Sequence, residues 1–494
     1  MTRRYVLLPT RGVRATEQRW YLTTQSLPRV TSLQRPVSVR LNVAPDEEVR
    51  VIDTTREDGP RLVELSDSAA DALNARGTGM RAVPEVVYGL PDPRPQPLGG
   101  ATAALASATT TVQITCLDAH NNQAVPTVRV VAFTDFTNRI GDEGDTDASG
   151  TVTLHLASSA VERLYAYAPA GHWGAFRTAL SASAPITVRL EPVDLSFVDA
   201  VRSYYGSSHF DPSAGVTVGV LDTGVGPHSD LNIVAGVNTV TGEKATDYED
   251  IEGHGTHVAG LIGSNGTPPT GLRGVAPDIS IRVYRVFGQD GQGATNYAVL
   301  KALIRAADDR CDIVNLSLGG GPYDQVVEEA VRDAREQGML AVIATGNDGR
   351  GIVNYPAAYQ YAVPVSAMGC EGTYPAGSAD EASVLRPPSS TADVKEFIAD
   401  FSNIGQQVFA TGPGVGVLST LPNNNFGPMS GTSMAAPVVS GAAACLLSRD
   451  PAVFAMARDH ARGDAIEALL AKACTPRGFG SIYEGRGLPD PAMI

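Results

Sequence analysis

The chain has 494 residues, of which 43% are hydrophobic and 18% charged, and its formal net charge is −15. This length predicts roughly three domains, with enough apolar residues for several cores. The acidic balance argues against a nucleic-acid partner and an anionic membrane surface, because both attract basic surfaces. Five cysteines are too widely scattered for a disulfide framework, and Cys311 and Cys445 lie in apolar contexts that suit core residues. The other three are Cys116, Cys370 and Cys474.

The first nine residues carry positive charge but only a short apolar run before Pro9. A secretory signal needs an apolar core of about 7 to 15 residues. No run in the chain approaches the roughly 20 apolar residues of a transmembrane helix. We therefore expect a cytoplasmic protein without a membrane span, and export by another route stays open.

Residues 1–90 alternate short apolar runs with one helical segment. The runs predict strands at 5–8, 49–52, 61–65 and 81–88, and residues 66–74 combine a capping residue with helix formers. We therefore predict a small α+β domain. Residues 91–108 are rich in proline, glycine and small residues, which predicts a linker.

Residues 109–193 alternate as in an antiparallel β-domain. Strands are predicted at 111–116, 127–133, 151–156 and 186–190, and residues 147–150 form a turn into the third. Trp173 lies in a glycine-flanked segment of this domain. It would contact a ligand if exposed, but tryptophan in a small β-domain is more often part of the core, which we favour.

Three segments of the C-terminal part carry an aspartate, a histidine and a serine. Asp222 ends a buried apolar strand, His254 lies near the start of a buried helix, and Ser433 precedes a long apolar helix. A serine hydroxyl is a weak nucleophile at neutral pH, so it needs an imidazole as base and a carboxylate to orient that imidazole. The helix N-terminus would also direct free N–H groups at the serine.

Three more segments contain candidate site residues. Two of them follow apolar strands, and the third is rich in glycine, which lets another backbone approach closely. Their candidate residues are Ala344, Thr345, Gly346 and Asn347; Ser317, Leu318 and Gly319; and Gly291, Gln292 and Gly293.

Each motif has a less specific interpretation. Asp-Thr-Gly often just closes a strand with a turn, and an aspartic protease would need a second copy of it. His254 and His257 form a metal pair only if further ligands exist, and the glutamate of His-Glu-x-x-His is missing, so His257 more readily packs beneath the site. Thr432 and Ser433 are also ordinary helix caps. Their joint occurrence, in the order Asp, His, Ser, favours catalysis.

With these motifs in this order, residues 197–480 resemble the subtilisin-like (subtilase, peptidase S8) serine proteases. The resemblance implies an α/β fold, with a mainly parallel sheet flanked by helices, after a small α+β domain and an all-β sandwich. Residues 481–494 would form a C-terminal tail. The resemblance also implies a triad of Asp222, His254 and Ser433, an oxyanion-binding amide at Asn347, and substrate binding by the three segments above.

The same resemblance implies that residues 1–90 are an inhibitory propeptide. Its tail, Val87 to Pro91, would lie in the active site like a product. Residues 109–193 resemble a carboxypeptidase-regulatory-like β-sandwich. We therefore predict a serine endopeptidase made as a self-inhibited zymogen, with peptide or protein substrates and its own N-terminal domain as intramolecular inhibitor. An esterase, or a subtilase-fold binding or regulatory protein whose propeptide stays bound, remains the alternative.

No cofactor is expected for catalysis. Asp230 matches a position at which many subtilases bind structural calcium, but residues 264–271 depart from their companion loop, so calcium stays an open alternative. Residues 370–395, rich in glycine, proline, serine and acidic residues, look like an insertion. We predict that they form a surface loop near the substrate.

Overall fold

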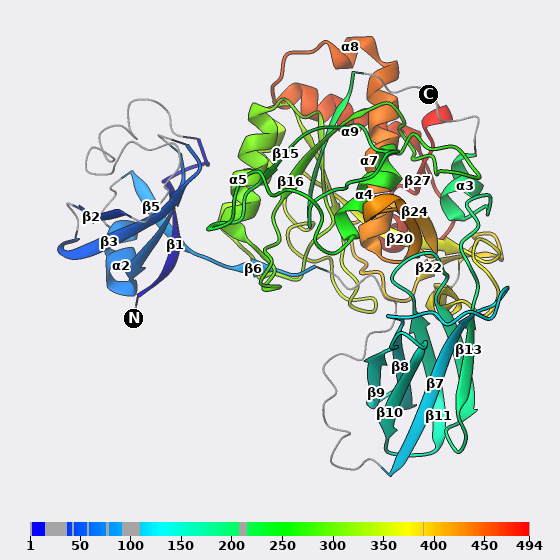
Figure 1. The fold of residues 1–494 in the computed structure, drawn as a ribbon. Helices are drawn as coiled ribbons and strands as arrows, with labels where there is room; N and C mark the ends of the chain where they lie inside the picture. Colours follow the sequence, from blue (N-terminus) through cyan, green and yellow to red (C-terminus); the bar gives the residue numbers. More distant parts are fainter. Residues whose placement is uncertain are drawn as a thin grey trace.

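The structure is a computed structural model that describes residues 2–14, 37–41, 44–56, 59–75, 79–90, 109–206, 215–388 and 390–493. It contains an N-terminal unit (residues 2–90), a unit of two sheets (residues 110–190, called the β7–β13 unit) and a large helix-flanked sheet. Figure 1 shows the N-terminal unit beside the large sheet and the β7–β13 unit below it. The predicted linker, 91–108, lies outside the described residues.

The N-terminal unit is a sheet of order β2-β3-β4-β1-β5 with helix α2 packed on it. Its elements are β1 (Thr2–Pro9), β2 (Val37–Leu41), β3 (Ala44–Thr54), β4 (Arg61–Ser66), α2 (Asp67–Ala75) and β5 (Met80–Pro84). Ser66 Oγ accepts a hydrogen bond from Ala69 N at 3.1 Å, so the expected capping residue begins the helix.

The predicted strand 81–88 is wrong as a single element. β5 ends at Pro84, and a separate strand β6 (Val87–Tyr88) pairs with β17 (Ala294–Thr295) of the C-terminal part. The break has a physical cause, because Asn296 binds the backbone on both sides of it. Asn296 Nδ2 donates to Pro84 O at 3.1 Å, and Asn296 N donates to Val86 O at 2.8 Å.

The β7–β13 unit has two sheets, of order β10-β7-β13 and β12-β11-β8-β9, around one apolar core. Its strands are β7 (Thr110–Asp118), β8 (Arg129–Asp135), β9 (Ile140–Asp145), β10 (Thr151–Leu156), β11 (Ala160–Tyr167), β12 (Ala175–Ser181) and β13 (Ile186–Leu190). The expectation of a purely antiparallel unit is wrong, since β13 runs parallel to β7. Alternation along a strand does not encode the direction of its partner.

The large sheet has nine strands in the order β15-β16-β14-β18-β19-β20-β22-β21, with β23 beside β20. They are β14 (Thr217–Asp222), β15 (Ile233–Asn238), β16 (Ser280–Arg285), β18 (Ile313–Leu316), β19 (Leu340–Ala344), β20 (Ala362–Cys370), β21 (Val384–Leu385), β22 (Glu396–Ala399) and β23 (Ala410–Pro413). All pairs are parallel except those that involve β22. This mainly parallel sheet agrees with the predicted α/β class.

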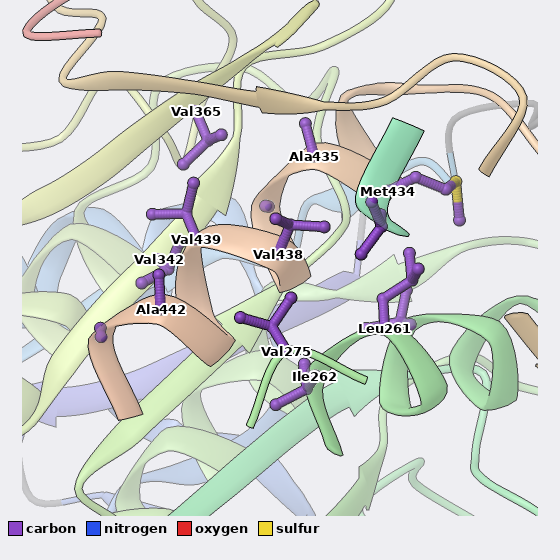
Figure 2. Packing of buried hydrophobic residues seen from close by; sticks show 14 of the residues in the cluster. Leu261, Ile262, Val275, Val342, Val365, Met434, Ala435, Val438, Val439 and Ala442 are labelled. Atoms are coloured by element: carbon purple, nitrogen blue, oxygen red, sulfur yellow. The ribbon is translucent and has the colours of Figure 1, made fainter. Parts of the chain in front are cut away.

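Helices flank the large sheet, and α7 is buried in the apolar core that the sheet shares with α4. The helices are α3 (Ala200–Tyr205), α4 (His254–Gly263), α5 (Asn296–Asp308), α6 (Gln325–Glu336), α7 (Thr432–Arg449), α8 (Pro451–Phe454), α9 (His460–Ala473) and α10 (Ser481–Glu484). Figure 2 shows Val438 and Val439 of α7 between Leu261 and Ile262 of α4 and Val365 of the sheet. Every residue from 432 to 447 is buried, so the N-terminus of α7 has a fixed place.

Short elements complete the C-terminal part. They are the strand pairs β24 (Val417–Leu421) with β25 (Asn425–Met429) and β26 (Cys474–Thr475) with β27 (Leu488–Pro489), and the 3₁₀ turns η2 (Ala379–Ser383), η3 (Pro422–Asn424) and η4 (Pro491–Met493). The residues predicted as a tail, 481–494, thus include α10 and a paired strand. None of the helices in the described ranges has the length and apolarity needed to cross a bilayer.

The predicted surface loop at 370–395 is wrong in part. It contains η2 and β21, and Asp380 and Ser383 are buried. The cause is its contact with β12, where Ala175 and Ser378 form a bridge and Ala379 N donates to Gly174 O at 3.0 Å. Composition indicated a loop, but it did not show that another unit covers the segment.

Single side chains followed their predictions more closely. Cys311 and Cys445 are buried, and all five cysteines are free thiols. Trp173 is buried as favoured, but it packs in the core of the large sheet and against Phe197 rather than in the core of its own unit.

Candidate active site

Asp222 and His254 lie together at the carboxyl edge of the large sheet. Asp222 is the last residue of β14, and His254 is the first residue of α4. His254 Nδ1 lies 2.7 Å from Asp222 Oδ1, and both side chains are buried. This bond fixes the orientation of the imidazole and leaves Nε2, which has no hydrogen-bond partner, as the nitrogen that can accept a proton.

The charge around His254 favours its protonated form. Burial lowers the pKa of His254, but the Asp222 carboxylate, helped by Asp250 and Glu252, raises it more, so the net pKa lies above its usual value. Asp250 also ties the two segments together, because it accepts hydrogen bonds from Thr223 Oγ1 and Gly253 N, both at 2.8 Å.

Sequence reasoning missed Asp250. A signal existed, namely an acid four residues before His254 at the predicted N-terminus of a helix, where a carboxylate is favourable. Asp250 also accepts a hydrogen bond from Thr256 N at 2.8 Å, so it caps the first turn of α4.

Ser433 lies in the first turn of α7 and is buried. Its Oγ makes a long hydrogen bond of 3.5 Å to Ser317 O, and no hydrogen bond joins it to His254 in this structure. Ser317 Oγ in turn donates to Ser433 O at 2.8 Å. Catalytic hydrogen bonds in enzymes without substrate are often long and tighten only when substrate binds.

Asn347 lies beside the same turn. Its Oδ1 accepts from Thr432 N at 3.0 Å and from Thr432 Oγ1 at 2.8 Å, which leaves the Nδ2 amide group as a donor. Gly346 N donates to Thr432 Oγ1 at 3.2 Å. Ala344 is a core residue, and Thr345 Oγ1 binds Asn403 O at 3.2 Å, so these two residues hold the segment.

The two predicted walls of a substrate cleft both contact the end of the N-terminal unit. Ala294 pairs antiparallel with Tyr88, and a Cβ on the preceding Gly293 would overlap that tail. On the other side Gly89 N donates to Gly319 O at 2.8 Å, and Gly319 N donates back to Gly89 O at 3.2 Å. The tail therefore lies as an extended strand between the two walls.

The remaining predicted residues of the walls have different surroundings. Leu318 is buried in the cluster that contains Tyr88, whereas Gly291 and Gln292 lie at an exposed turn. Pro91, the last residue of the predicted tail, lies outside the described residues.

Tyr88 fills a pocket with a polar floor. Its side chain is 0% exposed, and its hydroxyl lies 3.4 Å from Asp324 Oδ2 and 3.2 Å from the Tyr359 hydroxyl. Tyr359 donates to Asp324 O at 2.9 Å, and the Asp324 carboxylate caps α6. Asp324 and Tyr359 were not singled out in the sequence, because nothing in their local pattern distinguishes them from an ordinary helix cap and a core aromatic.

His257 lies on the next turn of α4 and is buried. Its Nε2 lies 3.1 Å from Gly427 O, and burial, with the nearby His254, lowers its pKa to about 3, so it is neutral. The position agrees with the favoured interpretation of His257 as a packing residue.

Asp230 is the candidate calcium ligand. Its Oδ2 is buried without a hydrogen-bond partner and faces Gly266 and Gly271, and Asn265 N donates to Asp230 O at 2.8 Å. Calcium binds carboxylate and backbone carbonyl oxygens, so this oxygen fits the ion. No group of three or more His, Cys, Asp or Glu side chains within the described ranges is placed to hold a metal, so carbonyls of residues 264–273 would have to complete the site.

Comparison with known proteins agrees with this geometry. Residues 213–483 match the model of the subtilase family. The chain is 37% identical to subtilisin BL of Lederbergia lenta over 238 residues, which are 48% of this chain and 78% of that protein. It is 34% identical to subtilisin DY of Bacillus licheniformis over 280 residues, which are 56% of this chain and 89% of that protein.

A longer relative is the minor extracellular protease Epr of Bacillus subtilis (strain 168). It is 35% identical over 281 residues, which are 56% of this chain but only 39% of Epr. The family match covers more than half of the chain. The protein therefore belongs to the subtilase family, and its C-terminal part is the catalytic domain of a subtilisin-like serine endopeptidase.

Proposed function

We propose that this enzyme hydrolyses peptide bonds through an acyl-enzyme formed on Ser433. His254 Nε2 takes the proton of Ser433 Oγ as that oxygen attacks the scissile carbonyl, and Asp222 holds His254. The tetrahedral oxyanion accepts hydrogen bonds from Asn347 Nδ2 and Ser433 N. The intermediate then expels the amine, which takes the proton from His254. Water next attacks the ester while His254 takes its proton, and His254 returns that proton to Ser433 Oγ as the acid product leaves.

The observation that carries this proposal is the convergence at one sheet edge of three separate segments. Asp222 orients the imidazole of His254. Ser433 lies at the N-terminus of α7, and Thr432 holds the amide of Asn347. Packing alone does not require this combination. A small-ester hydrolase would need the same groups, but the two backbone walls suit an extended peptide.

We further propose that the N-terminal unit is an intramolecular inhibitor. Its end runs between the two walls, and Tyr88 is anchored there. The body of the unit adds apolar contacts to α5 and α6 and ion pairs across the interface. Among these pairs are Arg14 with Asp333 and Lys301 with Asp53, both at 2.8 Å, and Arg81 with Glu329.

Self-processing is expected beyond Gly89. The paired bonds between Gly89 and Gly319 set the register of the tail, and the chain continues from there past Leu90. A cut in this region would release the N-terminal unit and leave the β7–β13 unit on the mature enzyme. We propose that the latter unit either recruits a substrate or stabilises the catalytic domain.

The test compares wild type with Ser433→Ala. Wild type is expected to react with a serine-directed phosphonate at Ser433, to cleave peptides and to gain a new N-terminus after residue 90, as identified by mass spectrometry. Ser433→Ala should lose all three. Processing that persists in Ser433→Ala would mean that another protease cuts the chain. A wild type that is never processed and never cleaves peptides would instead support a regulatory protein with a permanently bound inhibitor.

Two smaller proposals accompany this function. Asp230 and carbonyls of residues 264–273 would hold a structural calcium ion, which stabilises the fold and takes no part in the reaction. A cytoplasmic location stays a prediction from the sequence, and fractionation of the producing cells would test it.

A further inference from the structure

A buried carboxylate binds Ser430, three residues before the proposed catalytic serine, without belonging to the triad. Asp380, in η2 of the segment 370–395, is 6% exposed, and Ser430 donates to its Oδ1 at 2.6 Å. We propose that Asp380 is a positioning residue for the Ser433 site, and that the β7–β13 unit holds Asp380 in place. This inference rests on the proposed roles of Ser433 and Asn347.

Asp380 and Gly416 fix Ser430 from two sides. The Ser430 hydroxyl donates to Asp380 and accepts from Gly416 N at 2.8 Å, while Ser378 Oγ donates to the other carboxylate oxygen at 3.1 Å. The next residue is fixed as well, because Gly431 N donates to Gly414 O at 2.8 Å. The turn that leads into α7 therefore has hydrogen bonds at consecutive residues.

The same turn determines where the amide of Asn347 points. Thr432, two residues after Ser430, supplies both hydrogen bonds to Asn347 Oδ1. A shift of residues 430–432 would thus move the amide and Ser433 relative to each other. Misplacement of reacting groups by about 1 Å can lower a rate by about 100-fold.

A purely structural role explains the carboxylate poorly. Burial raises the pKa of Asp380, against the hydrogen bonds from Ser430 and Ser378, so the charged form is costly at this position. An apolar side chain of similar size would fill the space without that cost. What an apolar residue lacks is an acceptor for Ser430.

The β7–β13 unit fixes the residues that come just before Asp380 in the chain. Phe176 N and Arg177 Nη1 donate to Gly377 O at 2.9 and 2.8 Å, and Ala379 N donates to Gly174 O. Ala379 also packs against Val131, Phe133 and Tyr165. A continuous set of contacts therefore leads from β12 through η2 to the turn before Ser433.

The first experiment measures Asp380→Ala, Ser430→Ala and Asp380→Asn in the full chain, with a small peptide substrate and with phosphonate titration of active sites. Asp380→Ala and Ser430→Ala are expected to lower kcat per active site by about 10- to 100-fold with little change in KM. Asp380→Asn keeps an oxygen acceptor for Ser430, so its loss should be smaller. The control is Asp393→Asn, an exposed acid of the same segment that only caps Lys395 N, and it should behave as wild type.

The second experiment tests the contribution of the β7–β13 unit. Arg177→Ala removes a side-chain bond to Gly377 O and is expected to lower kcat a few-fold without changing KM. Arg129→Ala is the matched control, since its partners Glu143 and Asp145 lie in its own unit. Equal effects of Arg177→Ala and Arg129→Ala would overturn the coupling to β12.

The outcomes separate this inference from the proposed function. If wild-type Ser433 does not react with the phosphonate, the proposed function fails. If wild type reacts and cleaves peptides but Ser430→Ala keeps the wild-type kcat per titrated site, only the positioning role is overturned. Ser430→Ala and Asp380→Asn change the volume of the side chain only slightly, so both can be measured even if Asp380→Ala does not fold.

Discussion

His254 has three carboxylates around it, and each acts on its protonation. Asp222 binds Nδ1 directly, whereas Asp250 and Glu252 act through charge. General-base catalysis needs the neutral imidazole, which predominates only above the pKa of His254. Because that pKa is raised, activity should fall as the pH drops through a value above the usual one for histidine.

The change Asp250→Asn tests this dependence. It removes one negative charge near His254, so the pKa of His254 should fall and the acidic limb of the kcat/KM profile should move to lower pH. The measurement is the pH profile of peptide hydrolysis, with Asp247→Asn as control, since Asp247 is an exposed acid of the preceding loop. An acidic limb that stays in place would show that Asp250 only caps α4.

Single residues were predictable where local pattern and chemistry coincide. Asp222, His254, Asn347 and Ser433 each follow or begin a regular element, so their motifs were visible in the sequence. Asp380 was not, because its partner Ser430 lies 50 residues away and the two meet only through the docking of another unit. The roles of all predicted site residues await the activity measurements above.

Strand β6 is held by few backbone bonds and one large side chain. Val87 is 45% exposed, whereas Tyr88 is wholly buried, so the side chain of Tyr88 supplies most of the apolar contact of this strand. Burial of such a side chain is worth about 1.5 to 3 kcal/mol. The occupancy of the cleft by the tail should therefore depend strongly on Tyr88.

We expect Tyr88→Ala to open the cleft to other peptides. In the Ser433→Ala background, where nothing is cleaved, a fluorescent peptide should bind about tenfold or more tightly once the competing tail is weakened. Tyr88→Phe loses only the contacts to Asp324 and Tyr359 and should have a smaller effect. Val87→Ala is the control. Peptide affinity that is equal in all four proteins would contradict the anchoring role.

The loop 264–273 should respond to calcium through Asp230. Binding of an ion to the folded state alone adds about 2.7 kcal/mol when the ion is present at 100 times its dissociation constant. We expect the melting temperature of Ser433→Ala to be higher in calcium than in a chelator and expect Asp230→Ala to lose that difference. Asp247→Ala serves as the exposed control. Equal responses of both variants would place calcium elsewhere or exclude it.

Regular elements were predicted better than their partners. The apolar runs of the sequence correspond to β1, β4, β14 and β19, since burial and periodicity are local properties. The break after Pro84 and the parallel direction of β13 depend on contacts with distant residues, such as Asn296 and β7. The segment 370–395 was predicted wrongly in part for the same reason.

Across the whole chain, two units contact the catalytic part in different ways. The N-terminal unit reaches the cleft through its tail, and the β7–β13 unit approaches from the side of η2 and β25. The family resemblance implied that the N-terminal tail would lie in the active site, and its role as an inhibitor stays a proposal. The resemblance did not predict that the second unit shares its tryptophan with the catalytic core.

Deletion of residues 109–193 should lower activity on small peptides and on proteins by a similar factor. The reason is that the deletion uncovers Ala379 and removes the bonds that hold Gly377. The measurement is kcat/KM on both substrate types per phosphonate-titrated site. Loss on protein substrates alone would favour recruitment over stabilisation.

The second contact of the β7–β13 unit has a practical consequence. Gly171 N donates to Phe426 O at 2.9 Å, and the next carbonyl along, that of Gly427, accepts from His257 in the turn after His254. A replacement domain fused at the same place would have to reproduce this bond, Trp173 and the contacts to η2. The protein is therefore a poor scaffold for exchanging accessory domains, and new binding specificity is better engineered into exposed turns of the existing unit.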